Sequence, residues 1–256
     1  GCTDSTACNF NPEANMSDGS CEYAEEGYDC NGDILQFSLS FDGNDDYLYM
    51  DSLIFLHDEF TFSVKIKSSQ VIGNEGPYNP LIYFGDRLNT NNENSDFEVY
   101  FGNNGITVVT NRSSSSGEGH YFTSPFDYSD WLTLTVSYNS GLVSIYFDGV
   151  LSDSHQFSHR SINSNYNDLF VGSSMFINGD GLNESYFNGK IDDIIFWNKS
   201  LTEFEVQSQF NYNQAMDENL VGYWNLNEGS DNTVYDISGN GNHGTINGAV
   251  YSDDAP

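Results

Sequence analysis

Closely spaced acidic residues are the side chains of this sequence that could most readily do chemistry. They fall in three short segments: Asp42, Asp45 and Asp46 in FDGNDD, Asp192 and Asp193 in GKIDD, and Asp236 in DISGNGNHG. Carboxylate and carbonyl oxygens are the ligands that Ca²⁺ prefers in proteins, so these aspartates are candidate calcium ligands. The alternative is that Asp42 and Asp236 only cap their own turns, as aspartate does by accepting local backbone hydrogen bonds.

Four polar, glycine-rich segments could form a ligand-binding surface: NEGPYNP, RLNTNNENSD, NRSSSSGEGHY and INGDGLNES. A sugar needs an aromatic ring for its apolar face and polar side chains for its hydroxyl groups. Groups of these kinds occur in or beside the four segments: Tyr78, Arg87, His120, Tyr121 and Asp180. We predict that these five residues contact a carbohydrate, although any single tyrosine is more often part of a core.

The last of these segments could also hold a second calcium ion. Asn178, Asp180, Asn183 and Glu184 surround two glycines there. Their spacing suits an oxygen cage but lacks the full EF-hand pattern. A solvated hairpin tip is the alternative, because asparagine and aspartate are common turn residues.

The charge balance bears on which partners the protein can have. The chain has 256 residues, with 7 Lys+Arg against 38 Asp+Glu and a net charge of −31. Such a chain would repel a phosphate backbone, which excludes nucleic acid binding, and it would attract cations; acidity that serves only solubility is the alternative. The chain has no run of about 18 apolar residues, so the sequence predicts no membrane-spanning helix.

The cysteines divide the chain into two modules. Cys2, Cys8, Cys21 and Cys30 all lie in the first thirty residues, and none follows. An even number in a short polar segment predicts two disulfides and a secreted or cell-surface protein, with three pairings open. Zinc is the alternative, but it would favour C-x-x-C spacing or nearby histidines. We expect a stapled module at residues 1–33, a larger domain at 34–256, and a monomeric piece of a longer chain.

The first module is also rich in oxygen ligands at short spacing. They are Asp4, Asn9, Asn11, Glu13, Asn15, Asp18, Asp29 and Asp33. The string GCTDSTACNFNPEANMSDGSCEY resembles the short Cys-containing repeats of large secreted proteins of marine Bacteroidetes. It is loosely similar to the calcium loops of thrombospondin type 3 repeats. The resemblance implies a spacer or stalk unit, with calcium binding as a possibility for these oxygens.

The larger module has the period of two that is typical of β-strands. In FTFSVKI, residues 60–66, apolar Phe and Val or Ile alternate with Thr, Ser and Lys, and the same pattern recurs in WLTLTVSY, LVSIYF and GKIDDIIFW. Asp42-Gly43, Asp148-Gly149, Asn188-Gly189 and Asn247-Gly248 indicate tight hairpin turns. The sequence therefore predicts an all-β sandwich or jelly roll.

One short helix is expected over LTEFEVQSQF. Ser200 and Glu203 have capping-box spacing, and Leu201, Phe204 and Val206 form a partial apolar stripe. Such a helix would cover an edge or one end of the sandwich.

Five motifs carry a family resemblance: SLSFDGNDDYLYM, WLTLTVSYNSGLVSIYFDGVL, LFVGSS, YFNGKIDDIIFWNKSLTEFEV and LVGYWNLNEGSDNTVYDISGNGNHGTINGA. In this order and spacing they resemble a laminin-G-like domain of the concanavalin-A-like jelly-roll superfamily, over nearly all of residues 35–252. The resemblance implies two curved antiparallel sheets and an extracellular binding role, often with calcium. It also implies that the first and late strands are neighbours, so that Asp42 and Asp192 could share one Ca²⁺, completed by Asp236 or a carbonyl near Asn240.

Enzymatic alternatives find little support in the sequence. Jelly-roll glycosidases carry closely spaced acids in patterns such as E-x-D-x-x-E, and no such string occurs. Neither a G-x-S-x-G elbow nor an H-E-x-x-H pair is present. We therefore expect a secreted, calcium-dependent module that binds an extracellular polysaccharide or cell-surface glycan. A structural spacer without a small ligand is the first alternative, and a diverged polysaccharide-degrading enzyme is the second.

Overall fold

Two compact units make up the chain, Gly1–Phe37 and Ser38–Pro256. A computed structural model describes residues 1–25, 28–33, 35–51, 53, 58–68, 79–84, 97–102, 105–110, 118–124, 128–158, 168–178, 181–209 and 218–256. Tyr78, Arg87 and Asp180, three of the five predicted sugar contacts, lie outside these residues. Among the described residues, no helix has the length and apolar character needed to cross a membrane.

Two disulfides hold the first unit together. Cys2 bonds to Cys21 and Cys8 bonds to Cys30, so the prediction of disulfides is confirmed and one of the three pairings is selected. Apart from Cys2, Ala7 is the only buried apolar residue among those described in this unit. The bridges therefore take the place of a hydrophobic core, as is usual in small secreted modules.

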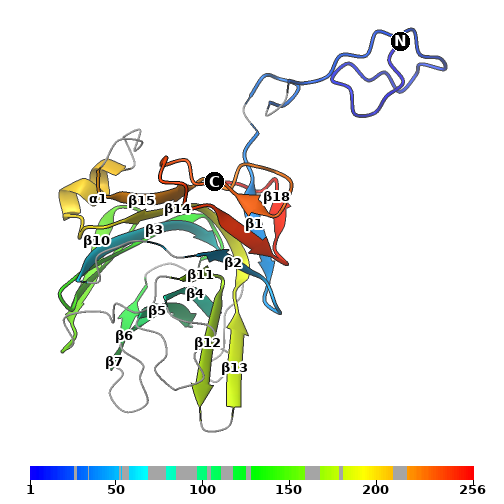
Figure 1. The fold of residues 1–256 in the computed structure, drawn as a ribbon. Coiled ribbons are helices and arrows are strands. Elements are labelled where there is room, and N and C mark those ends of the chain that lie inside the picture. The colour runs from blue at the N-terminus through cyan, green and yellow to red at the C-terminus, as the bar shows by residue number, and fades with distance from the viewer. Residues whose placement is uncertain are drawn as a thin grey trace. The chain divides into compact units, whose positions relative to one another are not determined.

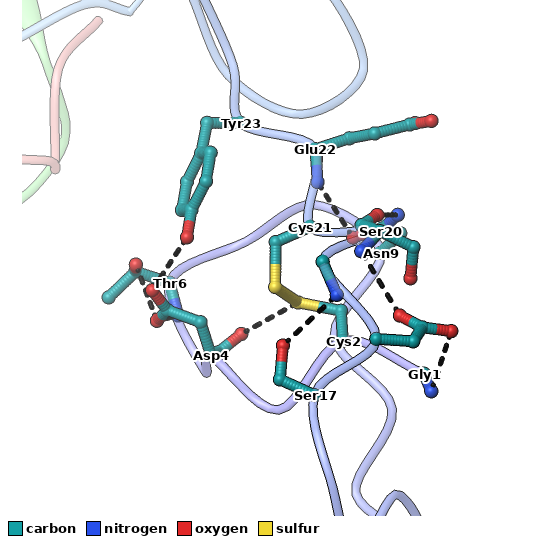
Figure 2. Close-up of a disulfide and its surroundings, with 12 residues drawn as sticks. Gly1, Cys2, Asp4, Thr6, Asn9, Ser17, Ser20, Cys21, Glu22 and Tyr23 are labelled. Atoms are coloured by element: carbon teal, nitrogen blue, oxygen red, sulfur yellow. Dashed lines mark hydrogen bonds and ion pairs between the residues drawn. A yellow bond between two sulfur atoms is a disulfide. The ribbon is translucent and has the colours of Figure 1, made fainter.

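Several oxygen ligands of the first unit serve its own turns. Asp4 accepts hydrogen bonds from the Thr6 nitrogen at 2.9 Å and from the Tyr23 hydroxyl at 2.8 Å, beside the Cys2–Cys21 bridge (Figure 2). Asp18 accepts a hydrogen bond from the Ser20 nitrogen at 3.0 Å. No three acidic side chains of the described part of this unit gather at metal-ligand distances. Local hydrogen bonds therefore account for Asp4 and Asp18.

The second unit is a sandwich of two antiparallel sheets (Figure 1). The first sheet has the order β10 (Val150–Gln156), β9 (Leu142–Phe147), β8 (Leu132–Asn139), β3 (Glu59–Lys67), β14 (Asn188–Trp197), β1 (Ser38–Asp42) and β18 (Val250–Ser252), and β15 (Leu220–Trp224) also pairs with β14. The second has the order β16 (Thr233–Val234), β17 (Gly244–Asn247), β2 (Tyr47–Met50), β11 (Leu169–Val171), β4 (Asn79–Phe84), β5 (Phe97–Gly102), β6 (Gly105–Thr110) and β7 (Glu118–Thr123). This confirms the predicted jelly-roll fold.

The core lies between the two sheets and is aromatic at its centre. Phe60 of β3 contacts the rings of Phe84, Phe97, Tyr138 and Phe196, with centroids 5.0 to 5.7 Å apart. The alternation predicted from FTFSVKI and WLTLTVSY is confirmed, because every second side chain of each run is buried in this core: Phe60, Phe62, Val64 and Ile66 in the first, and Leu132, Leu134, Val136 and Tyr138 in the second. Two-residue periodicity thus places the buried face of each strand correctly.

The helix α1 (Glu203–Gln209) covers part of the outer face of the first sheet. Val206 and Leu201 pack there with Trp197 in a small apolar cluster separate from the main core. Phe204, which the predicted stripe includes, is 78% exposed.

The capping box of α1 also differs from the prediction. It is formed by Thr202, whose nitrogen donates to the Glu205 carboxylate at 2.8 Å. The Ser200 hydroxyl instead hydrogen-bonds that of Ser137 at 2.9 Å. The prediction is wrong by two residues, because Ser200 and Glu203 have the same spacing as the true pair.

Only one of the four predicted turn dipeptides forms a hairpin. Asp148 and Gly149, with φ of 47° and 78°, join β9 to β10. Asp42-Gly43 and Asn247-Gly248 instead connect strands of different sheets, and Asn188-Gly189 opens β14. A positive φ is needed at a sheet crossing as well as in a hairpin, so the dipeptide alone does not distinguish the two.

The described parts of two segments predicted as loops are strands. Glu118–Thr123 forms β7, and the INGDGLNES segment forms the facing ends of β12 (Ser173–Asn178) and β13 (Gly181–Tyr186). This hairpin packs against β4, and Ser174 donates a hydrogen bond to the buried Glu98 of β5 at 3.2 Å. Polar composition suggests a loop, but these residues pair as strands.

The C-terminal segment is held against the first sheet by Asp254. Its carboxylate accepts hydrogen bonds from Lys67 of β3 at 3.0 Å, Lys190 of β14 at 2.7 Å and the indole nitrogen of Trp131 at 3.2 Å. The bonds from Lys190 and Lys67 hold the pKa of Asp254 well below its usual range. One carboxylate therefore joins the last residues to two central strands.

Candidate functional site

The turn between β1 and β2 brings three acidic side chains together. Asp42, Asp45 and Asp46 each place a carboxylate oxygen within 4.8 Å of the others. We call these three residues the acidic turn. Among the residues that the structure describes, no lysine or arginine forms an ion pair with any of them. The donor set consists of hard carboxylate oxygens, which fits Ca²⁺ rather than a softer metal.

Short hydrogen bonds fix the shape of the acidic turn. The carboxylate of Asp42 accepts the Asn44 nitrogen at 2.8 Å and the Asn44 amide side chain at 3.0 Å. The carboxylate of Asp46 accepts the Asp42 nitrogen at 2.7 Å. Each of these bonds uses only part of a carboxylate's capacity, because two oxygens offer about four lone-pair positions.

The acidic turn has an uneven electrostatic environment. Asp46 is buried, and the loss of solvation raises the pKa of its carboxyl, with the charges of Asp42 and Asp45 acting in the same direction. The hydrogen bonds from Asn44 lower the pKa of Asp42. A bound divalent cation would relieve the repulsion on Asp46.

Two residues that the sequence analysis does not select complete the surroundings of this turn. Asn188 of β14 donates its side-chain amide to the Asp42 carbonyl at 2.7 Å. Gly248, with φ of 81°, lies directly on the Asp46 carboxylate, since a Cβ there would be 2.1 Å from its Oδ1. The connection from β17 to β18 therefore braces the connection from β1 to β2. The only sequence signal for either residue is its Asn-Gly dipeptide.

The structure does not bring Asp192 to the acidic turn. In the pairing of β1 with β14, Asp42 lies opposite Asn188, and Leu39 lies opposite Ile191. Asp192 is therefore displaced by about four residues along the sheet, or roughly 13 Å. The strands are neighbours as predicted, but their register separates the two carboxylates, so the pair cannot share one ion.

Asp192 instead occupies a buried position within β14, where it pairs with Lys65 of β3. Burial raises the pKa of its carboxyl to about 7, and the charge of the adjacent Asp193 acts in the same direction. Asp193 itself forms an ion pair with Lys65 at 2.8 Å and accepts the Tyr223 hydroxyl at 2.8 Å. These contacts are those of a structural network within the first sheet.

Asp236 is likewise away from the acidic turn and organises its own loop. Its carboxylate accepts three backbone N–H groups, from Tyr223 at 3.0 Å, Ser238 at 2.9 Å and Asn242 at 3.0 Å. Asn240 donates its amide to the Leu220 carbonyl at 2.7 Å. The turn-capping alternative therefore describes Asp236.

The structure describes one side chain of the second predicted calcium site, that of Glu184 on β13. Its carboxylate accepts the Tyr186 hydroxyl at 2.9 Å. Asp180 and the side chains of Asn178 and Asn183 lie outside what the structure describes. This calcium site therefore stays a prediction.

Strand β7 places His120 and Tyr121 on opposite faces. His120 pairs with Val108, a core residue, whereas Tyr121 pairs with Thr107. Adjacent side chains of a strand point to opposite faces of the sheet. The two residues therefore cannot contact one ligand on the same face, and this part of the prediction is wrong. Tyr121 faces outward and is 48% exposed.

Tyr121 belongs to an open row of side chains on the outer face of the second sheet. Tyr100 of β5, Thr107 of β6 and Tyr121 of β7 are direct cross-strand neighbours. A Cβ at Gly105 would come within 2.9 Å of the phenol end of Tyr121, so the ring lies over β6. We call Tyr100, Thr107 and Tyr121 the tyrosine row. The ring of Tyr121 lies along the sheet surface beside Thr107, which carries a hydroxyl group.

Comparison with known families identifies this fold by sequence. The laminin G3 family model of the concanavalin A-like lectin/glucanases superfamily matches residues 42–207. The chain belongs to this superfamily. The acidic turn begins at the first matched residue, and α1 lies within the match. Among curated proteins, no significant match is found.

Solved structures of other proteins share the fold at low identity. A proposed carbohydrate-binding protein from Bacteroides ovatus matches with a TM-score of 0.63 and 17% identity, over 93% of this chain and 67% of that chain. The sialidase CBM40 of Ruminococcus gnavus, bound to α2,3-sialyllactose, matches with a TM-score of 0.52 and 12% identity, over 67% and 95%. A heptameric SAP-like pentraxin from Limulus polyphemus gives 0.51 and 18%, over 69% and 82%.

Among the described residues of this domain, the acidic turn and the tyrosine row are arrangements suited to ligand chemistry. The first offers clustered carboxylate oxygens, and the second offers an exposed aromatic ring with a neighbouring hydroxyl. Sequence reasoning finds the acidic turn and Tyr121. It misses Tyr100 and Thr107, because they face outward only through the register of β5, β6 and β7.

Proposed function

We propose that the second unit is a secreted, calcium-dependent module that binds carbohydrate, as part of a larger extracellular protein. The observation that carries this proposal is the half-exposed ring of Tyr121, which lies over β6 at Gly105 beside Thr107. A pyranose can rest its apolar face on such a ring while its hydroxyls bond to polar neighbours. The fold supports this function, since the CBM40 module that shares it is bound to sialyllactose.

The acidic turn is the proposed calcium site. Asp42 and Asp45 are exposed, and Asp46 is buried, so an ion would be held by the protein on one side and by water or ligand on the other. Ca²⁺ takes 6–8 oxygen ligands, and the three carboxylates supply part of that number. The ion would stabilise the corner where two connections cross between the sheets.

The two disulfides of the first unit support the proposal of secretion. Disulfides persist in oxidising compartments and are rare in the cytosol. The acidic turn and the tyrosine row support a binding role, because they offer recognition groups. Together these features favour a module that holds a longer protein on an extracellular polysaccharide or cell-surface glycan.

The test is a glycan array followed by titration of the glycans that bind, each with and without EDTA. We expect binding free energies of about −4 to −8 kcal/mol. Binding should be lost in the variant Tyr121→Ala. Tyr235→Ala is the matched control, because Tyr235 is also an exposed tyrosine, 54% accessible, but lies outside the tyrosine row. Equal binding by both variants would remove the site from the tyrosine row. Binding unaffected by EDTA would disconnect calcium from recognition.

The first unit favours a second role, as a spacer. Its disulfides close loops around turn hydrogen bonds, with almost no apolar core among the described residues. Such a unit can separate domains without a ligand of its own. Failure of every glycan to bind the chain would make this spacer role the better description of the whole segment.

A further inference from the structure

Two histidines meet where one edge of each sheet approaches the other. His120 lies on β7, an edge strand of the second sheet, and His155 lies on β10, an edge strand of the first. Their rings stack with centroids 3.6 Å apart and planes 7° from parallel. Each ring also contacts a buried phenylalanine edge to face, His120 with Phe122 and His155 with Phe157. We call His120 and His155 the seam histidines.

Side chains connect the two sheets at this seam. β7 and β10 each stand at the end of the strand order of their sheet, so no backbone ladder of the described residues joins them. The contacts across the seam include the stack of the seam histidines and the Glu118 carboxylate, which accepts hydrogen bonds from the Ser158 nitrogen, at 2.7 Å, and from the Ser158 hydroxyl. Elements held by few contacts open at a lower free energy than paired core strands. The seam is therefore a place where the sandwich can open locally.

The surroundings of the seam histidines favour uncharged rings. Their cross-strand neighbours on β6 and β9 are the apolar Val108 and Val143. Among the described charged groups, Asp153 lies two residues before His155 on β10, and Glu118 lies two residues before His120 on β7.

The seam histidines also disfavour each other's charge. Burial lowers the pKa of His120, the neighbouring His155 acts in the same direction, and Asp153 opposes them. Two imidazolium rings stacked 3.6 Å apart would repel each other at a distance that leaves no room for water between them. The stack is therefore compatible with neutral rings and is destabilised when both carry a proton.

We propose that His120 and His155 form an acid-sensitive latch, which joins the edges of the two sheets while the rings are neutral and releases them when both are protonated. Histidine is the side chain whose charge ordinarily changes between about pH 5 and 8, so the release belongs to mild acid. Water reaches the latch through a hollow of about 480 Å³. The hollow is lined by Glu118, Gly119, His155, Gln156, Phe157 and Ser158.

Proton linkage gives the direction of the effect. In the unfolded chain the two histidines are apart and bind protons near their ordinary pKa of about 6.5. The closed latch binds its two protons less tightly, so the open and unfolded states bind more protons than the closed state. The stabilisation by the latch is therefore complete above this pH and is lost as the pH falls. Tyr121 directly follows His120 on β7, so release would also disturb the tyrosine row; that consequence, unlike the latch, rests on the proposed function.

The first measurement compares the melting temperature of the full chain with those of His120→Phe and His155→Phe, which keep an aromatic ring in the stack. Between about pH 7.5 and pH 5, the wild type should lose about 3 °C or more relative to each variant. Asp192 and His243 titrate in all three proteins, so their contributions cancel in this difference. Equal changes in the three proteins would overturn the proposal.

Amide hydrogen exchange of the wild type locates the opening and does not depend on a variant that folds. After correction for the intrinsic effect of pH on exchange, the amides of β7 and β10 should exchange on the order of tenfold faster at about pH 5 than at about pH 7.5. The amides of the central strand β3 should keep their protection. Unchanged protection of β7 and β10 in acid would overturn the proposal.

Glu118→Gln is the matched control, because it weakens the other contact across the seam and keeps both imidazoles. We expect faster exchange of β7 at both pH values, with the same acceleration in acid as in the wild type. Loss of that acceleration in Glu118→Gln would assign the acid response to the carboxylate and contradict the latch.

Discussion

The acidic turn and the Asp236 loop have similar sequences but opposite surroundings. Both contain aspartate beside glycine and asparagine. Asp236 is enclosed by three N–H donors within 3.0 Å, whereas Asp46 accepts one backbone hydrogen bond and faces two other carboxylates. A carboxylate surrounded by donors is already neutralised by the protein. One surrounded by carboxylates needs a cation from outside.

The largest effect is expected from Asp236→Ala. Removing the carboxylate leaves three backbone N–H groups without their acceptor in a partly buried loop, and hydrogen bonds to a charged group each contribute about 1.5 to 3 kcal/mol. We expect a loss of about 4 kcal/mol in the free energy of unfolding, measured by urea denaturation. The loss should be the same with Ca²⁺ and with EDTA. A loss that disappears in EDTA would show that Asp236 acts through calcium.

Asp192 provides a third case, a buried carboxyl with few donors, and its effect depends on pH. Its pKa is raised by burial to about 7, above the usual value near 3.9 of an unfolded chain. The folded state therefore binds the proton more tightly, and this stabilisation is complete below about pH 4 and is lost as the pH rises toward 7.

The variant Asp192→Asn lacks this titration. Its free energy of unfolding relative to the wild type should rise by about 3 kcal/mol between pH 4 and pH 7. Urea denaturation of both proteins at the two pH values measures the change. A difference that stays constant with pH would show that Asp192 is ionised in the folded protein.

Calcium removal should affect stability through the acidic turn alone. At a hundred times its dissociation constant, an ion that binds only the folded chain adds about 2.7 kcal/mol. EDTA should therefore lower the melting temperature by about 5 °C or more, and it should have no effect on Asp46→Asn. An unchanged melting curve of the wild type, with metal analysis confirming that calcium was removed, would contradict a calcium site at the acidic turn.

The smallest effect is expected from Asp45→Asn without calcium. Removing one of three neighbouring negative charges should stabilise the chain by less than about 1 kcal/mol in EDTA. In calcium the same change should destabilise it. A sign that does not reverse between the two conditions, in calorimetric scans, would mean that Asp45 is not a ligand.

The strands and their buried faces are predictable from the sequence because alternation is a local property. The residues of FTFSVKI and WLTLTVSY show this, since their apolar positions line the core. The acidic turn is predictable for the same reason, because Asp42, Asp45 and Asp46 lie within five residues.

Contacts between distant segments are not predictable in this way. The family resemblance places β1 beside β14, but only the register shows that Asp42 faces Asn188 and not Asp192. A shift of four residues leaves the hydrophobic pattern unchanged, so nothing in that pattern selects the pairing. The stacking of His120 on His155 is hidden for a similar reason, because the two residues lie 35 positions apart in the chain.

The clamp at Asp254 has a mechanical consequence. The chain enters the sandwich at Ser38 and leaves it after Ser252, and these two residues are paired partners at the same end of β1 and β18. Tension applied through both ends would therefore peel the two strands apart, breaking their hydrogen bonds one at a time. Asp254 lies just beyond that point and is bonded to Lys67, Lys190 and Trp131. These contacts would bear the load first, so the clamp sets the force at which peeling begins.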